Sequence, residues 1–123
     1  SAFDTNNVFR GTALYMGASF TSAVTLNVVD KVFFGSGKTA TEITTNATPR
    51  TSPAGTYSIE TVNDNDYIWF LVPNTMNAIN KATLNGFDFP LSAMSPRIIG
   101  GVTYRVYRSA NTYLKGTRSI VVF

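Results

Sequence analysis

Apolar and polar residues alternate along most of the chain after residue 23, and this alternation predicts β-strands. In the first clear run, one parity is apolar except at Asp30, and its apolar members are Val24, Leu26, Val28, Val32 and Phe34. Alternation with a period of two places one set of side chains inside the protein and the other set in solvent. The segment Gly35-Ser36-Gly37 follows the run and predicts a turn.

Two further segments, Thr56–Val62 and Tyr67–Val72, are predicted to form strands. Between them lies the polar segment 63–66, Asn-Asp-Asn-Asp, which is typical of a turn. The second run is apolar on both parities, so it predicts a central strand that is covered on both faces and ends at Pro73. Residues 74–81 are expected to form a loop or a short helical turn.

Two glycine-containing pairs predict hairpins. Asn85-Gly86 is the stronger signal, because a type I′ turn needs a positive φ at both central residues. Gly100-Gly101 predicts a second hairpin, and its return strand at 102–108 alternates well. Tyrosines 104 and 107 of that strand should therefore point to opposite faces.

These runs predict an all-β protein: a single-domain antiparallel β-sandwich of about seven or eight short strands that closes with a strand at 119–123. Residues 1–22 follow neither the strand nor the helix period, so they are expected to form an irregular N-terminal arm that packs on residues 23–123 or on a neighbour. Residues 38–56 are rich in Thr, Ser and Pro, and predict a short strand at 41–44 followed by a long loop.

Composition limits the chemistry that this chain can perform. The 123 residues include no cysteine and no histidine, which excludes disulfides, thiolate metal sites and every nucleophile pair that uses histidine. The seven carboxylates stand in no catalytic motif, and no Gly-x-Ser-x-Gly segment occurs. Residues 35–39 end like a phosphate-binding loop, but Val32 stands where the first glycine is required. We therefore predict a non-enzyme with no cofactor, and a turn rather than a calcium site at 63–66.

Charge is sparse, at 14% of residues, and it is unevenly placed. No acid follows Asp88, whereas the last 27 residues contain five basic ones: Arg97, Arg105, Arg108, Lys115 and Arg118. This segment could face phosphate, lipopolysaccharide or an acidic partner, or it could be an ordinary solvated strand face. Nucleic acid is not expected, because the two tyrosines of 102–108 cannot stack on one ligand. No apolar run is long enough to span a membrane and no signal peptide is apparent, so no membrane insertion is expected.

Two loops, 38–56 and 109–116, are the predicted ligand contacts, because rigid β scaffolds present recognition residues on loops. The candidate residues in and beside them are Arg50, Arg108, Asn111, Tyr113 and Lys115. Tyr113 is the expected aromatic contact, with partial burial of its ring as the alternative.

The order of the strand motifs resembles a known family. Five runs follow one another as Lys31-Val32-Phe33-Phe34-Gly35, Asp66-Tyr67-Ile68-Trp69-Phe70-Leu71-Val72-Pro73, Leu84-Asn85-Gly86, Tyr104-Arg105-Val106-Tyr107-Arg108-Ser109 and Ser119-Ile120-Val121-Val122-Phe123. This succession, over residues 24–123, resembles a β-domain found towards the C-terminal ends of phage tail-fibre and baseplate-associated proteins. The resemblance implies a virion protein of host attachment or an oligomeric tail component, commonly trimeric, without a catalytic signature.

Three functions follow as hypotheses. The first is a non-catalytic tail-fibre-type protein of the virion, which acts outside the host cell and binds a surface receptor, with a glycan favoured, or neighbouring virion proteins. Such a protein would act as a homo-oligomer, with a trimer favoured, and multiply weak contacts through its copies. The second is a structural capsid decoration or tail-assembly subunit. The third is a bacterial carbohydrate-binding module.

Overall fold

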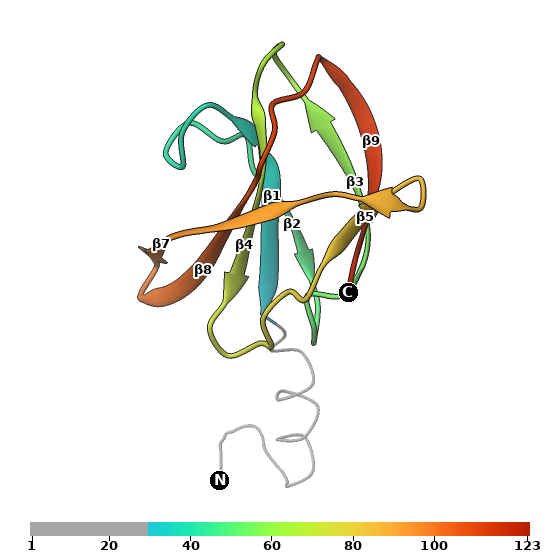
Figure 1. The fold of residues 1–123 in the computed structure, drawn as a ribbon. Helices are drawn as coiled ribbons and strands as arrows, with labels where there is room; N and C mark the ends of the chain where they lie inside the picture. The colour runs from blue at the N-terminus through green and yellow to red at the C-terminus, as the bar shows by residue number, and fades with distance from the viewer. Residues whose placement is uncertain (1–29) are drawn as a thin grey trace, which may run out of the picture.

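The computed structural model describes residues 30–123, which form nine strands in two antiparallel sheets (Figure 1). The strands are β1 (Lys31–Gly37), β2 (Asn46–Pro49), β3 (Gly55–Thr61), β4 (Tyr67–Pro73), β5 (Ala82–Leu84), β6 (Phe87–Asp88), β7 (Leu91–Ile99), β8 (Val102–Ser109) and β9 (Gly116–Val122). The larger sheet has the order β2-β1-β4-β8-β7, and the smaller has the order β3-β9-β5-β6. The predicted all-β sandwich is confirmed, with nine strands instead of seven or eight. The predicted arm at 1–22 and the start of the first predicted strand lie outside the described residues.

No helix within residues 30–123 is long and apolar enough to cross a membrane.

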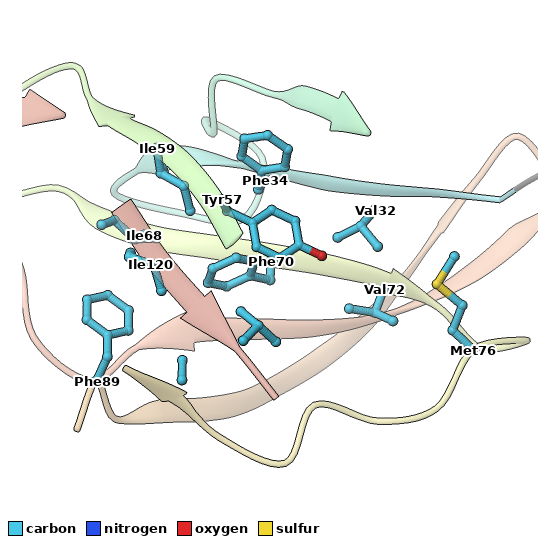
Figure 2. Packing of buried hydrophobic residues seen from close by; sticks show 12 residues of the cluster. Val32, Phe34, Tyr57, Ile59, Ile68, Phe70, Val72, Met76, Phe89 and Ile120 are labelled. Atoms are coloured by element: carbon cyan, nitrogen blue, oxygen red, sulfur yellow. The ribbon is translucent and has the colours of Figure 1, made fainter. Parts of the chain in front are cut away.

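The main core lies between the two sheets (Figure 2). Strand β4 contributes Ile68, Phe70 and Val72, all fully buried. Tyr57 of β3 packs edge-on against Phe70, at 5.2 Å between ring centroids, and similarly against Phe34 of β1, at 5.1 Å. Such edge-to-face pairs add to the free energy of burial, so this aromatic row joins the two sheets at their centre.

The opposite face of β4 carries a second, smaller core. Trp69 and Leu71 are buried there beside Tyr104 and Val106 of β8. Part of the cover comes from Ala40 and Ile43, which belong to the segment between β1 and β2. Strand β4 is therefore covered on both faces, as its continuous apolar run predicts.

Both predicted hairpins are confirmed. Asn85 has a φ of 53° and Gly86 has a φ of 81°, as a type I′ turn requires. Gly100 and Gly101 also have positive φ values, 57° and 79°, at the turn between β7 and β8. The position of each turn is therefore encoded by the local sequence.

The predicted turn at 35–37 is wrong. Gly35, Ser36 and Gly37 continue β1 and pair with β4 at Trp69, Ile68 and Tyr67 in that order. The glycine at 35 is needed for close packing and not for a turn: a Cβ there would lie 1.3 Å from the backbone oxygen of Thr44.

The segment 38–56 also differs from its prediction. Its short strand is β2, Asn46–Pro49, and not 41–44. Strand β2 pairs with β1 and divides the expected long loop into two shorter segments, 38–45 and 50–54.

Tyr57 connects this packing to a pH dependence. Its side chain is 1% exposed, and its hydroxyl donates a 2.6 Å hydrogen bond to the backbone oxygen of Pro53. Burial raises the pKa of the Tyr57 hydroxyl, and the nearby Arg50 guanidinium offsets part of that rise. The folded state therefore holds this proton more tightly than the unfolded chain, whose tyrosine pKa is about 10.

We expect Tyr57 to make the protein less stable as the pH rises. Its contribution is fully present below about pH 10, and is lost as the pH rises towards and through the raised pKa. Tyr57→Phe should lower the free energy of unfolding by about 1 kcal/mol at pH 7, because it removes a hydrogen bond. Between about pH 9 and 11 the free energy of unfolding of this variant should fall by less than that of the parent protein. Urea unfolding of both proteins across this range measures the difference. Parallel declines would show that Tyr57 does not contribute to it.

Candidate functional site: the loop end of the sandwich

Three segments meet at one end of the sandwich (Figure 1), and we call residues 38–45, 62–66 and 110–115 the loop end. Two backbone hydrogen bonds join the last two segments. The Asn65 amide donates to the Tyr113 oxygen, and the Tyr113 amide donates to the Asp66 oxygen, each at 2.9 Å. The loop end is therefore a continuation of the strand pairing, rather than a set of independent loops.

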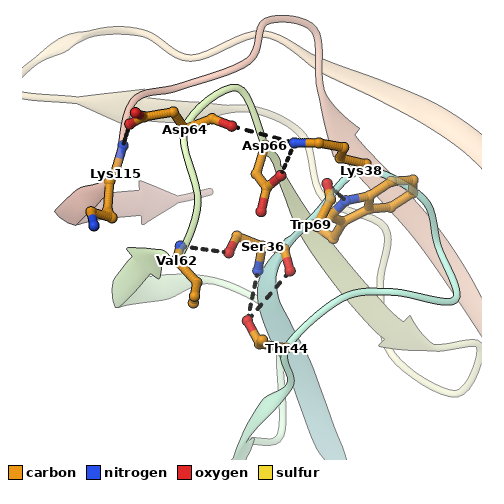
Figure 3. Close-up of polar contacts among 9 residues, drawn as sticks. Ser36, Lys38, Thr44, Val62, Asp64, Asp66, Trp69 and Lys115 are labelled. Atoms are coloured by element: carbon orange, nitrogen blue, oxygen red, sulfur yellow. Dashed lines mark hydrogen bonds and ion pairs between the residues drawn. The ribbon is translucent and has the colours of Figure 1, made fainter.

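A lysine–aspartate pair connects the first segment to the second (Figure 3). Lys38 Nζ lies 2.6 Å from Asp66 Oδ1 and donates a longer bond, 3.3 Å, to the backbone oxygen of Asp64. The Asp66 side chain is 4% exposed, whereas that of Lys38 is 58% exposed. A buried carboxylate without a partner is strongly unfavourable, so Lys38 holds the 63–66 turn in place while part of its own side chain meets solvent.

The predicted turn at 63–66 is confirmed, and a protein donor binds one carboxylate oxygen of each of its aspartates. Asp64 Oδ1 accepts a 2.8 Å hydrogen bond from the Lys115 amide. Within residues 30–123, no group of three or more acidic, cysteine or histidine side chains is placed to hold a metal ion. Asp64 and Asp66 therefore act as joints between the segments of the loop end.

Ser36 of β1 holds the first two segments through hydrogen bonds to Thr44 and Val62 (Figure 3). Its backbone oxygen accepts a 2.8 Å bond from the Thr44 amide, and its hydroxyl accepts a 3.0 Å bond from the Val62 amide. The Trp69 indole donates a 2.9 Å bond to the Gly37 oxygen beside it. These bonds, of which the Trp69 bond is buried, hold 38–45 against β1 and the 62–66 segment.

Ser109 fixes the third segment in the same way. Its fully buried hydroxyl accepts a 2.9 Å bond from the Ile68 amide and donates a 2.7 Å bond to the Asn111 oxygen. The backbone of Asn111 is thereby held, while its side chain is exposed.

Four of the five predicted contact residues lie in or beside the loop end. Asn111 and Lys115 are exposed there. Arg108 is half-buried: its guanidinium lies 4.1 Å from the centroid of the Tyr67 ring, and its Nε donates to the Ser109 oxygen. The side chains of Asn111 and Lys115 are therefore available to a ligand, whereas part of the Arg108 side chain is packed against Tyr67.

Tyr113 shows the partial burial that was the alternative to a free aromatic contact. Its ring stacks on the buried Phe89 ring, with 5.2 Å between centroids and 21° between planes. The Arg118 guanidinium lies 5.1 Å from the same ring. Leu114 is instead the exposed apolar residue of this segment, at 65%.

Arg50 lies at the opposite end of the sandwich and is not brought together with the other four. Its backbone amide bonds to the Asp30 oxygen at the start of β1. Its guanidinium donates to the oxygens of Ala54 and Thr56 and lies 4.0 Å from the centroid of the Tyr57 ring. These contacts close the 50–54 segment, so they indicate a structural role.

A polar groove beside the loop end was missed from the sequence. It has a volume of about 500 Å³ and lies between β2 and β3. Its lining residues are Phe34, Asn46, Ala47, Thr48, Ser58, Glu60 and Thr117. The exposed parity of β3 gives a signal for Ser58 and Glu60, but nothing in the sequence shows that β2 lies opposite them.

Comparisons with protein-family models, with curated proteins and with solved structures found no match to this chain. The structure itself describes the chain as an all-β sandwich with a polar loop end that hydrogen bonds hold in place.

Proposed function

We propose that this chain is a non-catalytic module of phage tail-fibre type, which binds a host-surface glycan through its loop end. One observation supports this function above others: hydrogen bonds between its segments and to β1 and β8 hold the backbone of the loop end, while polar side chains stay exposed. Those side chains are Asn63, Asn65, Asn111, Thr112 and Lys115. Side-chain amides and a hydroxyl on a backbone that is fixed in advance suit a ligand rich in hydroxyl groups, because the backbone needs little ordering on binding.

The order of strand motifs supports the tail-fibre assignment, with the virion tail as the site of action. In this proposal the chain works as a homo-oligomer, with a trimer favoured, and contacts other virion proteins. Each copy needs to bind only weakly, because linked copies raise the effective concentration of the remaining sites.

Exposed apolar residues favour a second candidate, a capsid decoration or tail-assembly subunit. Phe87 is 78% exposed and Ile98 is 74% exposed, and both lie beside hairpin turns. Large exposed apolar side chains are typical of protein–protein contact when they gather into patches. A bacterial carbohydrate-binding module is the third candidate, and the packing of the Tyr113 ring makes a planar aromatic platform at the loop end less favourable.

Binding of the full chain to an array of bacterial surface polysaccharides tests the leading proposal. We expect the double variant Asn111→Ala/Lys115→Ala to bind about tenfold more weakly, because it removes two hydrogen-bonding groups. The matched control is Asn77→Ala/Lys31→Ala, which removes the same residue types, both exposed, at the opposite end. This control should bind like the parent.

Two results would contradict the proposal. Absence of binding to every polysaccharide would remove glycan recognition, and equal weakening by both double variants would remove the loop end as the site. Light scattering on the same samples gives the oligomeric state, and a monomer would contradict the multivalent mechanism.

A further inference from the structure

The sandwich is open on the side where β2 and β3 form the edges of their sheets. Among the described residues, β2 pairs only with β1, and β3 pairs only with β9. The groove lies between these two edges. Its volume, about 500 Å³, is common for ligand sites. Phe34, 7% exposed, contributes to its lining, and its ring is braced by Tyr57 (Figure 2).

Each wall of the groove carries polar side chains. Asn46 and Thr48 of β2 are cross-strand neighbours of Phe34 and Val32, so they share the face of those buried residues. Within residues 30–123, the side chains of Asn46 and Thr48 form no hydrogen bond with protein groups that would compete with a ligand.

The other wall comes from the exposed parity of the smaller sheet. Ser58 and Glu60 lie on β3, and Thr117 of β9 is the cross-strand neighbour of Glu60. Together the two walls offer one amide, three hydroxyls and one carboxylate. The groove therefore presents a mixture of donors and acceptors above an aromatic residue.

The charge of the groove selects among ligands. Among the described residues that line it, Glu60 is the only ionisable one. Its carboxylate attracts hydroxyl donors and repels phosphate, sulfate or carboxylate groups. The basic residues near the C-terminus, which suggested an acidic ligand, do not line it. Its chemistry thus fits a neutral compound with many hydroxyl groups.

The groove is continuous with the loop end. Residue Asn46 directly follows segment 38–45. On the other wall, Glu60 and Thr117 stand next to the last cross-strand pair of β3 and β9, Thr61 and Gly116, beyond which the other two segments begin. A chain of sugars that contacts the loop end can therefore extend into the groove.

We propose that this groove is the subsite for a neutral sugar residue of the bound glycan, with Asn46 and Glu60 as its main hydrogen-bonding groups. This inference rests on the proposed glycan-binding function. It assigns selectivity for neutral over acidic glycans to Glu60. It also adds contacts from β3 and β9, outside the two predicted loops, to those of Asn46 and Thr48 within segment 38–56.

Titration of the ¹⁵N-labelled full chain with oligosaccharides, followed by NMR, tests the proposal. The neutral probes are maltohexaose, mannohexaose and chitohexaose, and the acidic probes are a hyaluronan hexasaccharide and sialyllactose. We expect a neutral probe to shift the amide signals of residues 46–48, 58–60 and 117. The variant Asn46→Ala/Glu60→Ala should bind that probe about tenfold more weakly, since two hydrogen-bonding groups are lost.

The matched control is Thr56→Ala, on the same strand and the same exposed parity as Glu60 but outside the groove. It should bind like the parent, and thermal unfolding by circular dichroism verifies that each variant is folded. A conservative variant, Glu60→Gln, should keep binding of the neutral probe and weaken the discrimination against the acidic ones.

The outcomes separate this inference from the function on which it rests. If a neutral probe shifts only loop-end signals and the Asn46→Ala/Glu60→Ala variant binds normally, the groove assignment is overturned while glycan binding stands. If the acidic probes bind the parent more tightly than the neutral ones, the neutral selectivity is overturned. If no probe binds, and the polysaccharide array is also negative, glycan binding itself fails.

Discussion

Replacing Phe70 by alanine is expected to lower the free energy of unfolding by about 3–5 kcal/mol. The Phe70 side chain is fully buried at the centre of the main core, edge-on to Tyr57. Its strand pairs on both sides, with Phe34 and Tyr107 as the neighbours of Phe70. The surrounding strands are therefore held by their own hydrogen bonds and cannot close around the cavity. Since small domains are stable by only about 5–15 kcal/mol, this variant should be close to unfolding at 37 °C.

The matched control is Phe87→Ala. Phe87 is 78% exposed, in the short strand β6, so its removal should change stability by less than about 0.5 kcal/mol. Urea unfolding followed by circular dichroism compares the two variants directly. Equal losses would mean that Phe87 is buried in solution, as in a self-associated form, and a small loss at Phe70 would contradict the described core.

Replacing Gly35 by alanine should have the second largest effect, a loss of about 3 kcal/mol, at the upper end of the range for overpacking. The new methyl group would lie 1.3 Å from the Thr44 oxygen, so residues 38–45 must move away from β1. Ala40 and Ile43 of this segment pack against the smaller core, which contains Trp69, the single tryptophan of the chain. We therefore expect tryptophan fluorescence to shift to longer wavelength even where the protein stays folded.

Gly86→Ala separates crowding from backbone strain. Gly86 has a positive φ, and the space that a methyl group would occupy there is open, with nothing within 4 Å. Alanine at this position therefore meets only the unfavourable left-handed conformation, which costs about 1–2 kcal/mol. Its tryptophan fluorescence should match that of the parent. If Gly35→Ala leaves both stability and fluorescence unchanged, the close contact between β1 and Thr44 does not exist in solution.

Several features of the fold could be predicted because their cause is local. Asn85-Gly86 and Gly100-Gly101 specify turns because glycine, and asparagine to a lesser degree, adopts a positive φ more easily than other residue types. The run at 67–72 is apolar on both parities, which predicts that both of its faces are covered. In the structure one face belongs to the main core and the other to the smaller core.

Other features depend on residues distant in sequence. The φ of Gly35 is not positive. A side chain is excluded at this position because the backbone of Thr44, nine residues later, occupies the space that a Cβ would need. Strand β2 is short, mostly exposed and has no apolar alternation, so only its pairing with β1 defines it. A glycine that permits close contact and a glycine that permits a turn are identical in sequence.

The candidate site shows the same division. Asn111 and Lys115 could be assigned to an exposed loop from their polar neighbours, and they are exposed. Arg50 lies at the end of the sandwich opposite the loop end, and Tyr113 stacks on Phe89. Both positions depend on how the chain passes from one sheet to the other. The groove is built from β2, β3 and β9, which are adjacent only after folding.

The position of β9 has a consequence for how the protein is made. Strand β9 lies between β3 and β5, and its pairing with β3 joins residues 55–61 to residues 116–122. The smaller sheet therefore cannot assemble until β9 has left the ribosome, and until then β3 and the inner face of the larger sheet lack their cover. Contacts this far apart in sequence also slow folding. In a cell that produces many copies at once, the nascent chains are thus exposed to one another during synthesis, and dilution or a chaperone at that stage would govern the yield of native protein.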